Sequence, residues 1–302
     1  MAARIYIGTS SWAEKALAAS GKFYPPELKD TPERLAYYAE RFNFGEIDST
    51  YYAFPSRKNT QRWAEAVPDG FKFNVKAFAL FTQHPTPLPS IPKSFRESLP
   101  PEAAKKSRVY YKDVPEGVSA EMAQIFLRGI SPLRDAGKLG ALLIDFPPWF
   151  VPSSDNRAYL RRARELFPGD HVVIEFRNRL WADDETLPST LDLLRELRCG
   201  LCCVDEPPGL KESFPPIAAA TASVALVRFR GRNAERWADK KASMEERLSW
   251  WYTDEELSEW LPRIEQLARA VDELYLAFNT KTEDQSVVNA AKLQKLLGLS
   301  TS

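Results

Sequence analysis

The sequence predicts an α/β protein built as a single (β/α)8 TIM barrel, with a long proline-rich insertion after the third strand. Short apolar runs alternate with helical patterns along the 302 residues, and this alternation is typical of a parallel sheet. Eight such units in a chain of this length fit a closed barrel, for which about 250 residues are typical. The competing fold is an open, doubly wound sheet, but the first run is followed by GTSSWAEKAL and not by a glycine-rich phosphate-binding turn.

Eight apolar runs are the expected barrel strands. In chain order they are RIYIGTS (4–10), FGEIDST, FKFNVKAF, ALLIDFP, HVVIEFR, GLCCVDEP, ALVRFRG and LYLAFNT.

Helical patterns separate these runs. The first is predicted over 31–42, with Thr31 as N-cap and Pro32 at the first helical position, and the second begins after a Ser56 cap. A helix is expected at about 119–138, and the last one ends before Gly298. The other helical patterns are SSDNRAYLRRARELF, LPSTLDLLRELR, a short turn near FPPIAAAT, and TDEELSEWLPRIEQLARAV.

One domain is expected over residues 1–302, interrupted by an irregular segment at about 80–118 that is rich in proline. Long loops in a compact domain are often lids or binding loops. A passive insertion is the equally weighted alternative.

Composition excludes several classes of protein. Lys plus Arg and Asp plus Glu are 41 each, so a nucleic-acid binder that depends on global charge is excluded and only a local patch remains. No apolar stretch is long enough to span a bilayer. Three cysteines argue against a disulfide framework and for a reducing, cytoplasmic location. With only 2 histidines, a multi-histidine zinc cluster is excluded, and no cofactor is predicted.

Polar residues of one parity mark the end of each strand. Glu46 and Asp48 alternate with Ile47, and Arg228 and Arg230 alternate with Phe229. Residues two apart on a strand point to the same side. We therefore expect these polar side chains to meet at the C-terminal mouth of the barrel, where such barrels carry their active sites.

The arginines predict an anionic ligand. Arginine forks match carboxylate and phosphate oxygens, so Arg228 and Arg230 are expected to anchor a phosphorylated or carboxylated small molecule. Glu175, Asp205 and Glu46 are candidate general acids or bases. The full set of candidates is Glu175, Asp205, Glu46 and Lys76 for catalysis, and Arg177, Arg228, Arg230, Asp48, Asn279, Trp12, Tyr51 and Trp181 for ligand binding, with Asp145 as a further charged strand end.

Other interpretations of the same residues remain open. The charges could form a purely structural ion-pair lattice, with Glu175 on Arg228 and Asp48 on Lys76. Each aromatic residue taken singly is best explained by packing under the loops. The arginines would also suit a nucleic-acid-binding or phosphodiester-processing protein, or a non-catalytic ligand sensor. A glycosidase is disfavoured because the seventh strand ends in arginines.

Two further sites receive little support. Serine–histidine catalysis is disfavoured because neither histidine ends a strand, although His84 in the proline-rich segment could reach the mouth. A divalent cation held by Asp and Glu is unsupported. The enzyme class, whether hydrolase, lyase or isomerase, and the oligomeric state stay open.

Taken together, several segments resemble the DUF72 family of TIM-barrel proteins along the whole length of the chain. They are IGTSSW (7–12), FYPPEL (23–28), LAYYAERFNFGEIDSTYY (35–52), FKFNVKAFALFTQH (71–84), LLIDFPPWF (142–150), VVIEFRNRLW (172–181), VRFRGRN (227–233), YTDEELSEW (252–260) and LAFNT with the later VVNAAKL (276–293).

The resemblance implies the barrel fold and no activity. Three positions depart from the usual family pattern. Asp48 stands where an asparagine is common, Arg230 stands where a histidine is common, and Gln83 separates Thr82 from His84.

Overall fold

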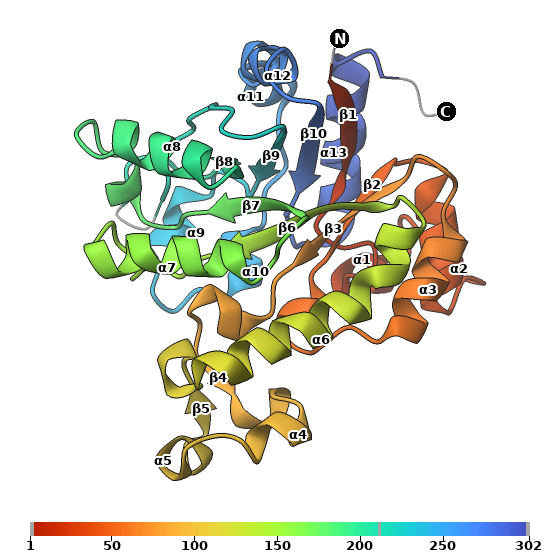
Figure 1. Cartoon of the computed structure of the whole chain (residues 1–302). Coiled ribbons are helices and arrows are strands. Elements are labelled where there is room, and N and C mark those ends of the chain that lie inside the picture. Colours follow the sequence, from red (N-terminus) through yellow and green to blue (C-terminus); the bar gives the residue numbers. More distant parts are fainter. Residues whose placement is uncertain (1–2, 211–212, 300–302) are drawn as a thin grey trace.

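Eight parallel strands close into a barrel in the computed structural model, which describes residues 3–210 and 213–299 (Figure 1). The order around the barrel is β1-β10-β9-β8-β7-β6-β3-β2. The predicted α/β barrel is therefore confirmed. The barrel strands are β1 (Arg4–Thr9), β2 (Phe44–Ile47), β3 (Lys72–Lys76), β6 (Leu139–Asp145), β7 (His171–Glu175), β8 (Cys199–Asp205), β9 (Val224–Phe229) and β10 (Glu273–Phe278).

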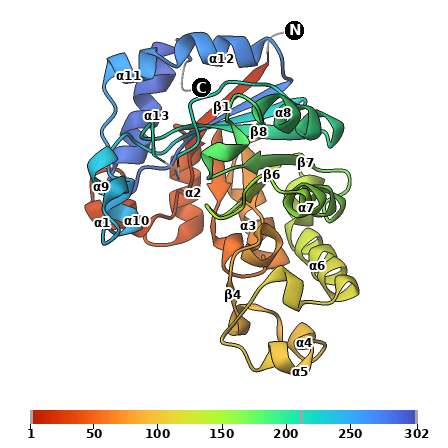
Figure 2. The ribbon, with the colours of Figure 1, turned by 90° about the vertical axis from the view of Figure 1, so that its left-hand side faces the viewer.

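Helices surround the barrel, and most of them follow a strand as expected (Figures 1 and 2). They are α1 (Lys15–Ser20), α2 (Thr31–Ala39), α3 (Arg57–Ala66), α6 (Glu116–Asp135), α7 (Ser154–Glu165), α8 (Leu187–Glu196), α9 (Ala234–Ala238), α10 (Met244–Arg247), α11 (Asp254–Ser258), α12 (Leu261–Ala268) and α13 (Gln285–Leu296). Short 3-10 helices are η1 (Ser49–Tyr51), η2 (Ala79–Thr82), η3 (Leu88–Ser90), η4 (Tyr111–Asp113) and η5 (Arg179–Trp181).

Three helical predictions are corrected by local chemistry. The N-cap of α2 is Asp30 and not Thr31, because the Asp30 carboxylate accepts the backbone N–H of Glu33 in a capping box. The helix predicted over 253–271 is broken between α11 and α12, where Pro262 occupies the first turn of the second helix and donates no backbone N–H. Residues 214–221 form no helix.

The proline-rich segment leaves the barrel after β3 as a projecting lobe, visible at the bottom of both views (Figures 1 and 2). It is more regular than predicted. Besides η2, η3 and η4 it contains β4 (Thr86–Pro87), paired antiparallel with β5 (Arg108–Val109), and the short helices α4 (Lys93–Arg96) and α5 (Pro101–Ala104).

The barrel interior is divided into layers. At its N-terminal end, Glu273 pairs with Arg4 at 2.7 Å and with Lys72 at 3.7 Å. Above this cluster the Tyr6 and Tyr275 rings stack with centroids 5.1 Å apart, which fills the interior with aromatic side chains. Polar residues of β2, β3, β7 and β9 lie on the C-terminal side of these two tyrosine rings. The rings therefore separate the charged C-terminal mouth from the charged N-terminal end.

Close approach of β1 and β2 requires a glycine. A Cβ atom built on Gly8 would lie 1.9 Å from the carbonyl oxygen of Phe44, so any side chain would push the two strands apart. This seam pairs over only two register positions, Gly8 with Phe44 and Thr9 with Gly45. Below it, the Asn43 amide accepts the N–H of Ile7 at 2.8 Å and donates to the carbonyl of Ile5 at 3.1 Å, replacing part of the ladder.

The structure also bears on two expectations from the sequence, one about disulfide bonds and one about membrane-spanning segments. The cysteines Cys199, Cys202 and Cys203 are buried and form no disulfide. Across the residues described above, no helix combines the length and apolar character needed to cross a bilayer.

We expect replacement of Lys138 by Met to destabilise the fold. The Lys138 ammonium is buried and donates to the carbonyls of Ala64 and Val67, each at 2.7 Å, at the C-terminal end of α3. Removing it leaves helix-end carbonyls unsatisfied, at a cost of about 1–3 kcal/mol. Urea unfolding measures the change in the free energy of unfolding. The control is Lys58→Met, which replaces an exposed lysine on α3. Equal stability of the two variants would contradict the prediction.

Candidate functional site

A buried guanidinium forms the centre of the C-terminal mouth. Arg228, near the end of β9, is completely buried and donates to Oε2 of Glu175 at 2.8 Å, to Glu46, and to Oγ of Ser10 at 3.4 Å. Burial of an unpaired guanidinium would cost several kcal/mol. The two carboxylates offset that cost, and they come from β7 and β2, so Arg228 bridges strands across the barrel.

A second arginine extends this lattice. Arg230, only 3% exposed, contacts Glu175 and lies 3.7 Å from Asp145 and 3.8 Å from Glu206. The predicted pair of Glu175 with Arg228 is therefore present. The same-side parity of Arg228 and Arg230 also holds, since both contact Glu175.

Lys76 has a different partner from the one predicted. Its ammonium lies 3.2 Å from Oδ2 of Asp145 and over the Tyr51 ring, 4.8 Å from the centroid. The predicted pair of Asp48 with Lys76 is wrong at ion-pair distance, because Asp48 lies instead 3.8 Å from Arg228. The Lys76 and Asp48 side chains keep 15% and 24% exposure, so both reach the open side of the mouth.

The mouth contains more carboxylates than the sequence interpretation assumed. Its carboxylates are Glu46, Asp48, Asp145, Glu175 and Glu206, and its cations are Lys76, Arg177, Arg228 and Arg230. Arg228 and Arg230 are enclosed by these carboxylates, so neither has a free face for an anion. Arg177 differs. Within the described part of the chain it makes no ion pair and its side chain is only partly buried, although its Nε lacks a hydrogen-bond partner just as those of Arg228 and Arg230 do.

The pKa values of two carboxyl groups at the end of β2, Glu46 and Asp48, are shifted in opposite directions. Burial raises the pKa of Glu46 to about 8, although Arg228 opposes the shift. Burial would also raise the pKa of Asp48, but Lys76, Arg228 and a hydrogen bond from Glu46 hold it below its ordinary value. The folded structure therefore favours the protonated form of Glu46 and the ionised form of Asp48.

A shared proton explains two otherwise unpaired oxygens. Oε2 of Glu46 and Oδ1 of Asp48 are both buried without a partner when each group is treated as a carboxylate. With a proton on Oε2, Glu46 donates to Asp48 while its other oxygen accepts from Arg228. Both oxygens are then satisfied.

The pKa values of two other carboxyl groups at the mouth, Asp145 and Glu206, also differ from each other. Burial would raise the pKa of Asp145, but Lys76 and Arg177 hold it below its ordinary value. Burial raises the pKa of Glu206 to about 7 despite Arg230. Glu206 was not predicted from the sequence. It is the inward residue at the end of the β8 run, because Cys202, four residues earlier, has its Sγ 3.8 Å from Glu175.

Asp205 lies on the opposite face from its predicted position. Its carboxylate accepts from Arg232 at 2.7 Å, from Tyr252 Oη at 2.8 Å, and from Trp260 Nε1. All three donors come from the long connection between β9 and β10. Asp205 is therefore a fully bonded anchor behind the barrel wall, and the expectation that it acts as an acid or base is corrected.

Two predicted ligand-binding aromatics also point away from the mouth. Trp12 packs edge-on against Trp63 and Phe73 under α3. Trp181 has no exposed surface, stacks on Phe176 with centroids 4.4 Å apart, and donates Nε1 to the carbonyl of Phe150. Both are packing residues, so stacking on a ligand is corrected for each.

The remaining predicted residues lie at the mouth or beside it. Tyr51 is half-buried beneath the Lys76 ammonium. Asn279, 7% exposed, has a buried Oδ1 without a partner. His84 lies against Tyr51, with ring centroids 5.3 Å apart, and burial lowers its pKa to about 4.

Across the described ranges, no group of three or more His, Cys, Asp or Glu side chains is arranged to hold a metal ion.

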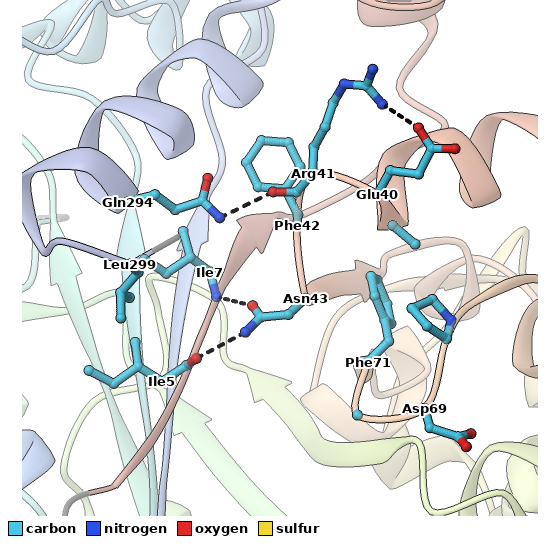
Figure 3. A pocket seen from close by; sticks show the side chains of 13 residues that line it. Ile5, Ile7, Glu40, Arg41, Phe42, Asn43, Asp69, Phe71, Gln294 and Leu299 are labelled. Atoms are coloured by element: carbon cyan, nitrogen blue, oxygen red, sulfur yellow. Dashed lines mark hydrogen bonds and ion pairs between the residues drawn. The ribbon is translucent and has the colours of Figure 1, made fainter. Parts of the chain in front are cut away.

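A cavity of about 530 Å³ opens at the other end of the barrel, beside the seam of β1 and β2 (Figure 3). Its polar side chains are already used by the protein. Asn43 bridges the backbone of Ile5 and Ile7, and Gln294 donates to the carbonyl of Arg41 at 3.2 Å (Figure 3). Among its described lining residues the ion pair of Glu40 with Arg41 is exposed, in contrast to the buried ion pairs of the mouth.

Comparison with known proteins identifies relatives of the whole chain. Residues 6–302 match the family model described as "Protein of unknown function DUF72". The chain is 26% identical over 302 residues to the UPF0759 protein YunF of Bacillus subtilis, covering 99% of this chain and 96% of that protein.

Two solved structures extend the likeness. A DUF72 family protein from Enterococcus faecalis is 25% identical with a TM-score of 0.79, covering 98% of this chain and 96% of that one. A DUF72 family protein from Thermotoga maritima is 29% identical with a TM-score of 0.74, covering 97% and 99%. None of these names specifies a reaction.

We expect Asp205→Asn to reduce the free energy of unfolding by about 2–4 kcal/mol. The substitution removes the buried negative charge that pairs with Arg232, and it places an amide NH2 group against side chains that themselves donate hydrogen bonds. Urea unfolding measures the loss. The matched control is Glu259→Gln, which removes the exposed partner of the same arginine and should cost below about 1 kcal/mol. The anchoring role is wrong if the two variants are equally stable.

Proposed function

We propose that this chain, which belongs to the DUF72 family, is an enzyme that binds an anionic small molecule at the C-terminal mouth and performs acid–base chemistry on it. The proposed acid–base unit is the pair Glu46 and Asp48. The proposed anion contacts are Arg177 and Lys76. Arg228 and Arg230, which the sequence favoured as anchors, become positioning residues.

The observation that carries this proposal is the contact of buried Glu46 with Asp48, each with a buried oxygen that otherwise lacks a partner, for which we infer a shared proton. Two neighbouring carboxyl groups with opposite protonation states are the usual arrangement of an acid–base pair. Because one proton serves two oxygens, the pair can either give a proton to a ligand or take one from it.

Exposure assigns the roles within the pair. Asp48 keeps 24% of its side chain exposed and is the group that touches the ligand, whereas Glu46 is fully buried behind it. Glu46 therefore supplies or accepts the proton through Asp48. Arg228 fixes Glu46 by hydrogen-bonding its other oxygen, which holds the pair in place without reorganisation during the reaction.

Charge balance supports an anion next to this pair. Arg177 has no carboxylate partner within the described ranges, and Lys76 has one, Asp145, while its tip remains accessible. An anion between the two cations would complete the pairing that the lattice leaves unfinished. Arg177 follows β7 and Lys76 ends β3, so a ligand between them lies over β6 and close to Asp48.

We expect Glu46→Gln to remove the transferable proton while keeping the fold. The amide still accepts from Arg228 and donates to Asp48, so the lattice is preserved. Infrared difference spectra at pH 7 should show a protonated carboxyl band that is absent from the variant. Any turnover found with a panel of phosphorylated and carboxylated metabolites should fall at least about 100-fold.

The matched control is Glu206→Gln, which changes the other buried carboxyl group of the mouth. It should leave intact the carboxyl band that titrates near pH 8. A Glu46→Gln protein with full turnover would overturn the acid–base role, and a wild-type protein that binds no anion at low salt would overturn the anionic ligand.

We also expect stability to depend on pH through Glu46. Its pKa is raised in the folded state from 4.5 to about 8, so the folded protein holds a proton that the unfolded chain releases. This contribution is complete below pH 4.5 and is lost as pH rises through 8. Asp48, Lys76, Arg228 and Glu175 are the charged groups that face Glu46.

Urea unfolding of wild type and Glu46→Gln from pH 4.5 to 9 measures this dependence. The difference in unfolding free energy between the two proteins should shift in favour of the variant as pH rises. A difference that stays constant across that range would show that Glu46 is ionised in the folded protein.

A further inference from the structure

His84 lies at the mouth although the sequence places it in the proline-rich segment. It follows η2 at the base of the lobe and packs edge-on against Tyr51. The charges that act on it are those of Asp145, Lys76 and Arg177. The histidine is therefore beside the proposed anion contacts.

Hydrogen bonding suggests which ring nitrogen carries the proton. Thr82 Oγ1 lies 2.9 Å from the carbonyl oxygen of Ala79 and 2.8 Å from Nδ1 of His84. We assign the hydroxyl proton to the carbonyl, so that Nδ1–H donates to Oγ1. Nε2 is left with a lone pair and acts as an acceptor.

A left-handed residue ends η2 and turns the chain back at His84. Gln83, between the two bonded residues, is the C-cap of η2 and has a φ of 64°, which is a common way for a helix to end. The bend places the imidazole within hydrogen-bond distance of Thr82.

The ring stays neutral across the physiological range. Burial lowers the pKa of His84 to about 4, and Lys76 and Arg177 act in the same direction, against Asp145. Nε2 is consequently an uncharged acceptor beside two cations. A ligand cation there would be repelled by Lys76 and Arg177, and a second anion would be repelled by the lone pair. A hydroxyl group is the donor that fits both constraints.

We propose that the ligand is a hydroxylated anion, whose hydroxyl group donates a hydrogen bond to Nε2 of His84 while its phosphate or carboxylate contacts Arg177 and Lys76. This inference rests on the proposed function, because it takes the anionic site as given. It adds a specificity-determining residue and a substrate class, that of hydroxy acids and phosphorylated polyols.

Matched ligand pairs test the hydroxyl group alone. Propane-1,2-diol 1-phosphate is compared with n-propyl phosphate, and lactate with propanoate, by calorimetry at low salt. Wild type should prefer the hydroxylated member of at least one pair by about three- to tenfold, the range expected for one neutral hydrogen bond. The pair that binds identifies the anion as phosphate or carboxylate.

Variants separate this inference from the proposed function. His84→Phe keeps an aromatic ring against Tyr51 and should abolish the preference while both members still bind. His84→Gln, which returns an acceptor near the Nε2 position, should restore part of it. Arg177→Gln should weaken both members equally, by about tenfold or more. His171→Gln, at the exposed start of β7, is the control.

Each outcome decides a claim. A preference that survives His84→Phe, or its absence in wild type, overturns the His84 inference and leaves the anionic site standing. Failure of wild type to bind any of the four anions overturns the proposed anionic ligand and this inference with it.

Nitrogen NMR tests the tautomer independently of any ligand. The chain has 2 histidines, so His171→Gln leaves a single imidazole to observe. Its spectrum should show a proton on Nδ1 and a bare Nε2 down to about pH 4. Thr82→Val should release this tautomer, and a bare Nδ1 in the protein with native Thr82 would overturn the assignment.

Discussion

The mouth of this barrel depends on one buried guanidinium. Arg228 joins Glu46 on β2 to Glu175 on β7 from its own place on β9, so a single side chain links strands that are not neighbours in the sheet. Buried ion pairs contribute little net stability, but removal of one partner is costly because a charge is then left unpaired. Arg228 therefore fixes the geometry of the site more than it stabilises the fold.

This constraint explains why one carboxyl group keeps its proton. Arg228 divides its charge between two carboxylates, and the neighbouring Asp48 adds a further negative charge next to Glu46. Burial then makes the neutral form of Glu46 the favourable one, while partly exposed Asp48 stays ionised beside Lys76. The acid–base pair that we propose thus follows from an imbalance of charge among buried groups.

Strand parity made part of the site predictable. Alternation placed Glu46 with Asp48, and Arg228 with Arg230, on the inner face, because polar and apolar residues alternate clearly in both runs. The β8 run has no polar residue before Asp205 to mark its parity, so the choice between Asp205 and Glu206 needed the contact of Cys202 with Glu175. Partners such as Asp145 for Lys76 depend on the shear of the barrel, which local sequence does not encode.

Charge neutralisation also changes which cation matters for a ligand. The sequence counts arginines, whereas binding depends on arginines that the protein has not already paired. Arg228 and Arg230 are enclosed by carboxylates, and Arg177 is not. Because an anion would have to displace a buried carboxylate from either of the first two, a ligand gains most by approaching Arg177, next to Lys76 and the neutral acceptor of His84. In the function that we propose, the ion-paired residues below would form the closed floor of the binding site and leave only a few groups accessible to the ligand.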